Sequence, residues 1–137
     1  MAGIVRRLLI AYDGGDPART ALELGIQLGT ATGAAIGIVS VAPVERGVAP
    51  DDPWSRMSEH AAALYEAKRR VSEAGLAAET HEPTGDPGPS IVDVAASFGY
   101  DTVVIGARRL DPIRRRLLGS VSTYVAHHSR ATVIIAR

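Results

Sequence analysis

Residues 101–125 read DTVVIGARRLDPIRRRLLGSVSTYV and contain a strand, a loop and the start of a helix in succession. Residues 101–105 have the β-branched and apolar composition of a buried strand, and Gly106 ends the run. An arginine-rich loop follows, and Gly119-Ser120 opens a segment with the pattern of an amphipathic helix. A strand that leads through a loop to a helix N-terminus is the building unit of parallel α/β folds.

The same stretch has the chemistry of a phosphate-binding site. The first amides of a helix have no partner within the helix and carry partial positive charge, so they attract an anion. Gly119 lets an oxyanion approach the main chain closely, and Ser120 and Ser122 add hydroxyl groups. Guanidinium groups can donate two parallel hydrogen bonds to a phosphate. The loop offers five of them, of which we expect one or two to contact a ligand: Arg108, Arg109, Arg114, Arg115 and Arg116.

Strands and helices are predicted to alternate along the whole chain. The strand-like runs are mostly apolar throughout, as in a sheet that is covered on both faces, and they span residues 8–12, 34–41, 76–81, 101–105 and 132–136. Helical patterns span residues 17–32, 54–74, 87–98 and 120–128, and a surface loop is expected at 43–53. This order predicts one α/β domain over residues 1–137, a doubly wound sheet with helices on both faces.

Turn residues mark the ends of the predicted helices. Asp16 is expected to be the N-cap of the first helix, with Pro17 in its first turn. Gly33 and Gly75 follow the first and second helices, where a left-handed C-terminal residue is favoured.

Asp13 follows the first strand, and this position suggests a ligand contact. In a doubly wound sheet the ligand lies beyond the carboxyl ends of the strands, where the winding direction reverses. We place this point between the first and fourth strands, so Asp13 and Gly106 should meet there. Asp13 could accept a hydrogen bond from a ribose hydroxyl, or it could be a solvated turn residue beside two glycines.

The charge distribution favours a small anionic ligand. The chain has 15 basic and 15 acidic residues, with 8 basic and 14 acidic before residue 106 and 7 basic and 1 acidic from there on. A neutral chain argues against broad nucleic-acid binding, whereas a local basic region suits one small anion. The chain has no cysteine, and no run of about 20 apolar residues, so we expect a cytoplasmic protein.

Several common catalytic motifs are missing from the sequence. There is no Gly-Lys-Ser/Thr of a Walker A loop, no Gly-x-Gly-x-x-Gly and no Gly-x-Ser-x-Gly. His127 and His128 are adjacent, so on a helix their side chains diverge and cannot form a metal-binding pair. We therefore predict no catalytic residue and no metal ligand.

These residues resemble the universal stress protein family in order and spacing, over residues 8–136. The ATP-binding branch of that family carries an Asp after the first strand, a backbone contact in the second strand and the motif Gly-x2-Gly-x9-Gly-Ser/Thr. The corresponding positions here are Asp13, Val41 and Gly106-x2-Arg109-x9-Gly119-Ser120.

The resemblance implies a five-stranded parallel sheet of order 3-2-1-4-5, of the adenine nucleotide alpha hydrolase-like type, and a homodimer joined through the fifth strand. It also implies that ATP or a related adenine nucleotide binds with adenine near Asp13 and Val41 and phosphates between Gly106 and Ser120, with Mg²⁺ as a potential companion. The predicted nucleotide-binding residues are Ala11, Tyr12, Asp13, Val41, Ile105, Gly106, Arg108, Arg109, Gly119, Ser120, Val121 and Ser122.

Arg109 replaces the second glycine of the family motif. Its side chain could fold over the phosphates as a clamp, or it could block their approach to the main chain. The first alternative predicts a non-catalytic nucleotide-binding stress regulator with at most slow ATP hydrolysis. The second predicts a dimeric interaction module that no longer binds ATP. A smaller ligand, such as a cyclic nucleotide, is a third alternative.

Overall fold

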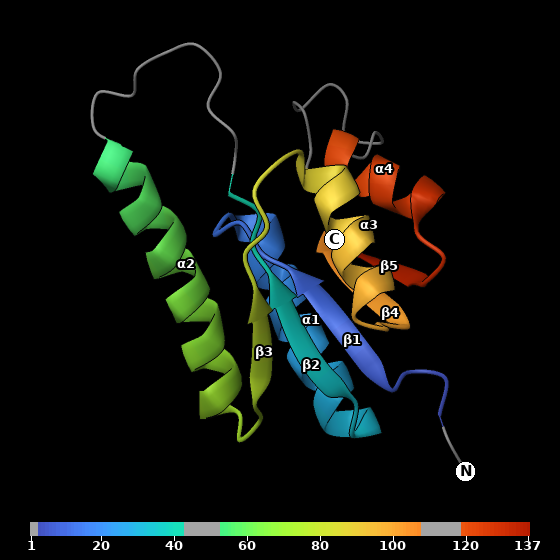
Figure 1. Ribbon diagram of the computed structural model, residues 1–137. Helices are drawn as coiled ribbons and strands as arrows, with labels where there is room; N and C mark the ends of the chain where they lie inside the picture. Colours follow the sequence, from blue (N-terminus) through green and yellow to red (C-terminus); the bar gives the residue numbers. More distant parts are fainter. Residues whose placement is uncertain (1–2, 43–52, 108–118) are drawn as a thin grey trace.

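The computed structural model describes residues 3–42, 53–107 and 119–137, without the side chains of 53–59. In this part of the chain, strands and helices alternate from end to end (Figure 1). The strands are β1 (Arg7–Ala11), β2 (Ala35–Val39), β3 (Ala78–His81), β4 (Thr102–Gly106) and β5 (Thr132–Ala136). The helices are α1 (Asp16–Thr32), α2 (Pro53–Glu73), α3 (Pro87–Ser97) and α4 (Ser120–His128).

The strands form one parallel sheet in the order β3-β2-β1-β4-β5, which confirms the expected topology. Leu8 of β1 pairs with Ile36 of β2 on one side and with Thr102 of β4 on the other. The chain winds outward from β1 to β3, crosses over and winds outward again from β4 to β5. The winding direction therefore reverses between β1 and β4.

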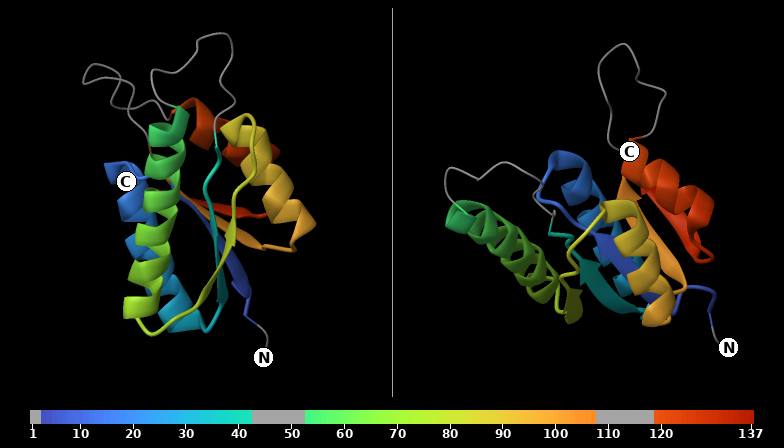
Figure 2. Two further views of the ribbon diagram at one scale, coloured as in Figure 1. Left: turned by 60° about the vertical axis from the view of Figure 1, so that its left-hand side comes forward. Right: turned by 45° about the horizontal axis from the view of Figure 1, so that its top comes forward.

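Each face of the sheet carries its own apolar core. Alternate residues of β1 point to opposite faces: Leu8 and Ile10 pack with α1 and α2, whereas Leu9 and Ala11 pack with α3. All four side chains are buried. The helices therefore form two outer layers around the sheet, and the views in Figure 2 show these layers from two directions.

The start of α1 differs from the prediction. Its N-cap is Gly15, not Asp16, and no side chain caps the helix. The Asp16 carboxylate, at the first helical position, instead accepts a hydrogen bond from Arg19 Nη1 at 3.1 Å. The C-terminal ends of α1 and α2 agree with the prediction. Gly33 and Gly75 follow these helices in the expected left-handed conformation, with φ angles of 73° and 80°.

The second strand is shorter than predicted. The apolar pattern runs on to Val41, but β2 ends at Val39. Beyond it the chain still pairs on one side: the Ser40 amide donates to the His81 carbonyl, and the Ala42 amide donates to the Pro83 carbonyl. Pairing on the β1 side stops earlier, because β1 has already turned into the loop towards α1.

Tyr100 packs across the α3 side of the sheet. A Cβ atom at Gly37 of β2 would lie 2.7 Å from Tyr100 Cε1. Past this glycine, the Tyr100 hydroxyl reaches His81 Nε2 of β3 at 2.7 Å. The Arg7 guanidinium lies 4.7 Å from the centre of the same ring. One buried side chain, from the connection between α3 and β4, thus joins β2 and β3 on this face.

Ion pairs join the helices on the other face. Arg70 of α2 makes two hydrogen bonds to the Glu23 carboxylate of α1, at 2.7 and 2.8 Å. Arg19 of α1 lies 3.5 Å from the Glu66 carboxylate of α2. Across the described ranges, no helix is both long and apolar enough to span a membrane.

Candidate functional site

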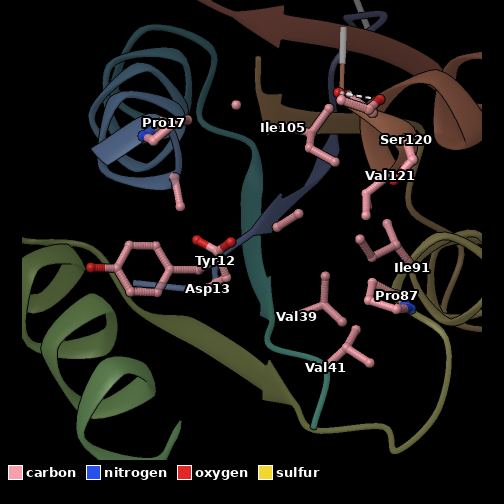
Figure 3. Close-up of a pocket in the computed structure, with 15 residues that line it drawn as sticks. Tyr12, Asp13, Pro17, Val39, Val41, Pro87, Ile91, Ile105, Ser120 and Val121 are labelled. Atoms are coloured by element: carbon pink, nitrogen blue, oxygen red, sulfur yellow. Dashed lines mark hydrogen bonds between the residues drawn. The ribbon is translucent and has the colours of Figure 1, made fainter. Parts of the chain in front are cut away.

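A pocket opens at the carboxyl ends of β1, β2 and β4, where the winding direction reverses (Figure 3). This is the position that the fold predicts for a ligand. The cavity has a volume of about 240 Å³. Its lining consists of Ala11, Tyr12, Asp13, Pro17, Ala18, Val39, Val41, Pro87, Ile91, Ile105, Gly106, Gly119, Ser120, Val121 and Ser122.

Apolar side chains from the end of β2 and the start of α3 form one side of the pocket. Val39 and Val41, two residues apart, project to the same side of the extended chain, and Figure 3 shows them facing Pro87 and Ile91 of α3. Ile91 is only 3% exposed and belongs to the core on this face of the sheet. A flat apolar group can therefore pack against this apolar side of the pocket.

The main chain of Val41 supplies polar groups in this apolar region. The Tyr12 amide donates to the Val39 carbonyl at 2.9 Å, which is the last main-chain hydrogen bond between these two segments among the described residues. Two residues further on, the amide and carbonyl of Val41 take part in no hydrogen bond among the described residues. A donor and an acceptor of one residue are thus available beside these apolar side chains. Such a pair suits a ligand edge with an adjacent acceptor and donor.

Asp13 supplies the one carboxylate among the described residues that line the pocket. Its Oδ1 accepts a hydrogen bond from the Gly15 amide at 2.9 Å. Gly14 between them has a φ of 86°, a left-handed conformation that glycine adopts without strain. The loop is therefore built to hold the carboxylate, and Figure 3 shows the Asp13 side chain among the other lining residues.

The N-terminus of α4 forms the polar end of the pocket. Gly119 is the N-cap, in an extended conformation, and the Thr123 amide donates to its carbonyl at 3.0 Å. The amides of Ser120, Val121 and Ser122 precede this first helical hydrogen bond, so they are free of the helical ladder and favour an anion. The buried Ser122 hydroxyl donates to the Gly119 carbonyl at 3.2 Å. In this structure its proton is therefore used in a hydrogen bond to the main chain and not directed at the pocket.

The sequence model of the universal stress protein family matches residues 5–137. The chain belongs to the universal stress protein family. A universal stress protein of Synechocystis is 41% identical over 69 residues, which cover 50% of this chain and 45% of that protein. A universal stress protein of Bacillus subtilis is 27% identical over 145 residues, which cover 96% of this chain and 98% of that protein.

Solved universal stress proteins share the fold. A universal stress protein solved in complex with cAMP is 25% identical, with a TM-score of 0.79, and the match covers 98% of this chain and 99% of that one. A universal stress protein from Archaeoglobus fulgidus is 22% identical, with a TM-score of 0.81, over 96% of this chain and 98% of that one. The five-stranded parallel architecture is therefore that of the family.

Tyr12 contributes to the pocket of this universal stress protein as a neutral group. Its side chain is buried, and Figure 3 shows the ring pointing from the pocket towards α2. Burial first, and then the Glu66 carboxylate, raise the pKa of the phenol. The hydroxyl therefore keeps its proton at neutral pH, and the residue acts through its ring and main chain.

The predicted site residues that the structure describes all line the pocket. These are Ala11, Tyr12, Asp13, Val41, Ile105, Gly106, Gly119, Ser120, Val121 and Ser122. Arg108 and Arg109 lie outside the described residues, so the two alternatives for Arg109 remain predictions.

Sequence reasoning missed five lining residues, which are Pro17, Ala18, Val39, Pro87 and Ile91. Val39 could have been found, because it lies two residues before Val41 and so projects to the same side. No sequence pattern of this kind pointed to Pro87 and Ile91 of α3. They line the pocket only because the fold packs this helix beside the end of β2.

Proposed function

We propose that this universal stress protein binds an adenine nucleotide in the pocket and acts as a non-catalytic regulator in a stress response. The observation that carries the proposal is the main chain of Val41, whose amide and carbonyl form no hydrogen bond with the described residues and lie beside apolar side chains. Adenine offers an acceptor nitrogen next to its amino donor and can pair with both groups. The relative solved with cAMP, at 25% identity, supports the choice of ligand class.

The proposed orientation follows from the two polar ends of the pocket. The base packs against Val41 and Ile91, and the ribose hydroxyls point towards Asp13. The phosphates point towards the N-terminus of α4, where the amides from Ser120 onward favour negative charge. For ATP, Arg108 or Arg109 would complete the phosphate site. We assign no metal-binding residue, because no group of three or more His, Cys, Asp or Glu within the described ranges could hold a metal ion.

A mononucleotide is the second candidate ligand. The cavity of about 240 Å³ is smaller than most ligand sites, which typically measure roughly 300–1,000 Å³. A nucleoside monophosphate or a cyclic nucleotide needs less room and fewer phosphate donors than ATP. This volume favours AMP or cAMP over a triphosphate.

We further propose that residues 1–137 act as one cytoplasmic domain that forms a homodimer through β5. This strand is an edge of the sheet, and its residues Val133, Ile134 and Ile135 are only partly buried. An apolar edge strand tends to pair with another chain unless something covers it. Light scattering after gel filtration should give the mass of a dimer, and Ile134→Lys should give a monomer.

Calorimetric titration with AMP, cAMP, ATP and GTP tests the nucleotide proposal. The adenine nucleotides should bind, and GTP should bind at least about tenfold more weakly, since its base presents the opposite donor and acceptor to Val41. Val41→Pro removes the amide donor and should weaken AMP binding by roughly 5- to 100-fold. Val41→Ala retains the amide and is the matched control, so its loss should be smaller.

No binding heat for any nucleotide at millimolar concentration, with a folded protein and a confirmed dimer, would overturn the proposal. That result would favour the dimeric interaction module instead. Arg109→Gly then distinguishes the two roles of this residue: a gain of ATP affinity indicates a blocked site, and a loss indicates a clamp.

A further inference from the structure

We infer that Gly106 is a positioning residue: the first turn of α1 packs against it, and this contact sets the position of the Asp13 carboxylate. The absence of a side chain at Gly106 makes room for the main chain of α1 rather than for a phosphate. The inference rests on the proposed nucleotide site, because its readout is the recognition of the ribose. It concerns a glycine at the end of β4 that lines the pocket.

The space beside Gly106 is occupied by Pro17. A Cβ atom at position 106 would lie 2.8 Å from Pro17 Cβ, and closer still to the carbonyl carbon and oxygen of Pro17. Cβ atoms in proteins essentially never approach other heavy atoms within 3.0 Å. The obstacle is mainly backbone, which cannot rotate away as a flexible side chain could. The close contact between β4 and α1 therefore requires glycine at this position.

The contact holds one end of the loop that carries Asp13. Pro17 is the second residue of α1, and the Arg19 amide donates to the Gly15 carbonyl at 3.0 Å. Gly15 in turn donates its amide to Asp13 Oδ1 at 2.9 Å. A short chain of contacts thus leads from Gly106 through the first turn of α1 to the carboxylate.

The other end of the same loop is held by the sheet. The Tyr12 amide donates to the Val39 carbonyl at 2.9 Å, directly before Asp13. With this end fixed, a displacement of the first turn of α1 has to be absorbed by residues 13–16. The position of the Asp13 carboxylate relative to the pocket therefore depends on how closely α1 approaches Gly106.

Gly106→Ala tests the inference when ribose and phosphate recognition are measured separately. The affinity ratio of adenosine to 2′,3′-dideoxyadenosine reports the ribose contact, and the ratio of ATP to adenosine reports the phosphate contacts. We expect Gly106→Ala to lower the first ratio by roughly 5- to 10-fold, as for the loss of one hydrogen bond, and to leave the second within about twofold. Gly3→Ala is the control, because a Cβ there would meet only the Val5 carbonyl oxygen, at 3.9 Å.

A second variant covers the case in which Gly106→Ala does not fold, as judged by circular dichroism. Pro17→Gly loosens the same turn of α1 without adding an atom, and it should lower the ribose ratio in the same direction with the phosphate ratio retained. An unchanged ribose ratio in a folded variant would overturn the inference.

Two further outcomes separate the inference from the proposed function. A fall in the ratio of ATP affinity to adenosine affinity in Gly106→Ala would assign the glycine to the phosphate site and overturn the inference. Equal affinity of the wild-type protein for adenosine and 2′,3′-dideoxyadenosine would also overturn it. A wild-type protein that binds none of the three ligands would instead refute the proposed nucleotide site itself.

Discussion

Gly37→Ala is expected to destabilise the fold through a single side chain, Tyr100. The added Cβ would lie 2.7 Å from Tyr100 Cε1 and closer still to the Cζ atom and the hydroxyl oxygen. Tyr100 is 5% exposed and crosses the face of β2 to reach β3, so it cannot keep this position. The ring has to turn away, or the strand has to shift.

The expected cost follows from the contacts that this movement breaks. Forcing a methyl group into a packed site costs about 1–3 kcal/mol. The hydrogen bond between the Tyr100 hydroxyl and His81 Nε2, 2.7 Å long, contributes about 1 kcal/mol, and the contact with Arg7 adds about 0.5 kcal/mol. Alanine is better than glycine in a strand by roughly 0.5–1 kcal/mol, which opposes these losses. The net loss should be about 2–3 kcal/mol.

Urea denaturation followed by circular dichroism measures this loss, and a double-mutant cycle identifies its source. In a Tyr100→Leu background the ring is gone, so Gly37→Ala should cost less than about 0.5 kcal/mol, with a coupling energy of about 2 kcal/mol between the positions. A cost below about 0.5 kcal/mol in the wild-type background would refute the reasoning. An equal cost in both backgrounds would also refute it.

Three further variants test the ion pairs, the pH dependence and the anion site. Arg70→Met removes the paired hydrogen bonds to Glu23, so it should lower the free energy of unfolding at low ionic strength, and this loss should shrink towards zero at about 1 M NaCl. Burial lowers the pKa of His81, so the unfolded chain binds more protons between the two pKa values. The free energy of unfolding should then fall as the pH drops below about 6.5, and His81→Gln should flatten this dependence in urea titrations; an unchanged slope would exclude His81 as its source. Ser120→Glu places a carboxylate in the first turn of α4, where it should stabilise the fold by about 0.3–1 kcal/mol. The same carboxylate should weaken the binding of ATP more than that of adenosine, because it repels the phosphates. Unchanged ATP affinity would count against the proposed phosphate position.

The strands could be predicted from composition because each is a short apolar run between turn residues. β5 was placed correctly at Thr132–Ala136, whereas the second strand was predicted too long. Ser40 and Val41 continue the extended pattern, but β1 has turned away and no longer pairs there. Apolar periodicity records burial, and it does not record where the neighbouring strand ends.

The first helix shows why local rules fail at the candidate site. Asp16 is a good capping residue by type, yet its carboxylate bonds to Arg19 while Asp13 takes the Gly15 amide. The first turn of this helix also packs against Gly106, which lies about 90 residues away in the sequence, and a local capping rule takes no account of such a contact.

The candidate site was predictable where it depends on strand ends and glycines. Asp13, Gly106 and Ser120 each follow a strand or open a helix, so the fold places them together. The α3 wall, with Pro87 and Ile91, depends on long-range packing that leaves no period in the sequence.

An NMR titration with AMP tests the central claim most directly, because it shows both whether a nucleotide binds and where. If AMP binds in the pocket, we expect saturable shifts of the amide signals of Val41 and of Ser120, Val121 and Ser122, with no comparable shifts along β5. Unchanged spectra at millimolar AMP, or shifts confined to residues far from the pocket, would contradict that claim.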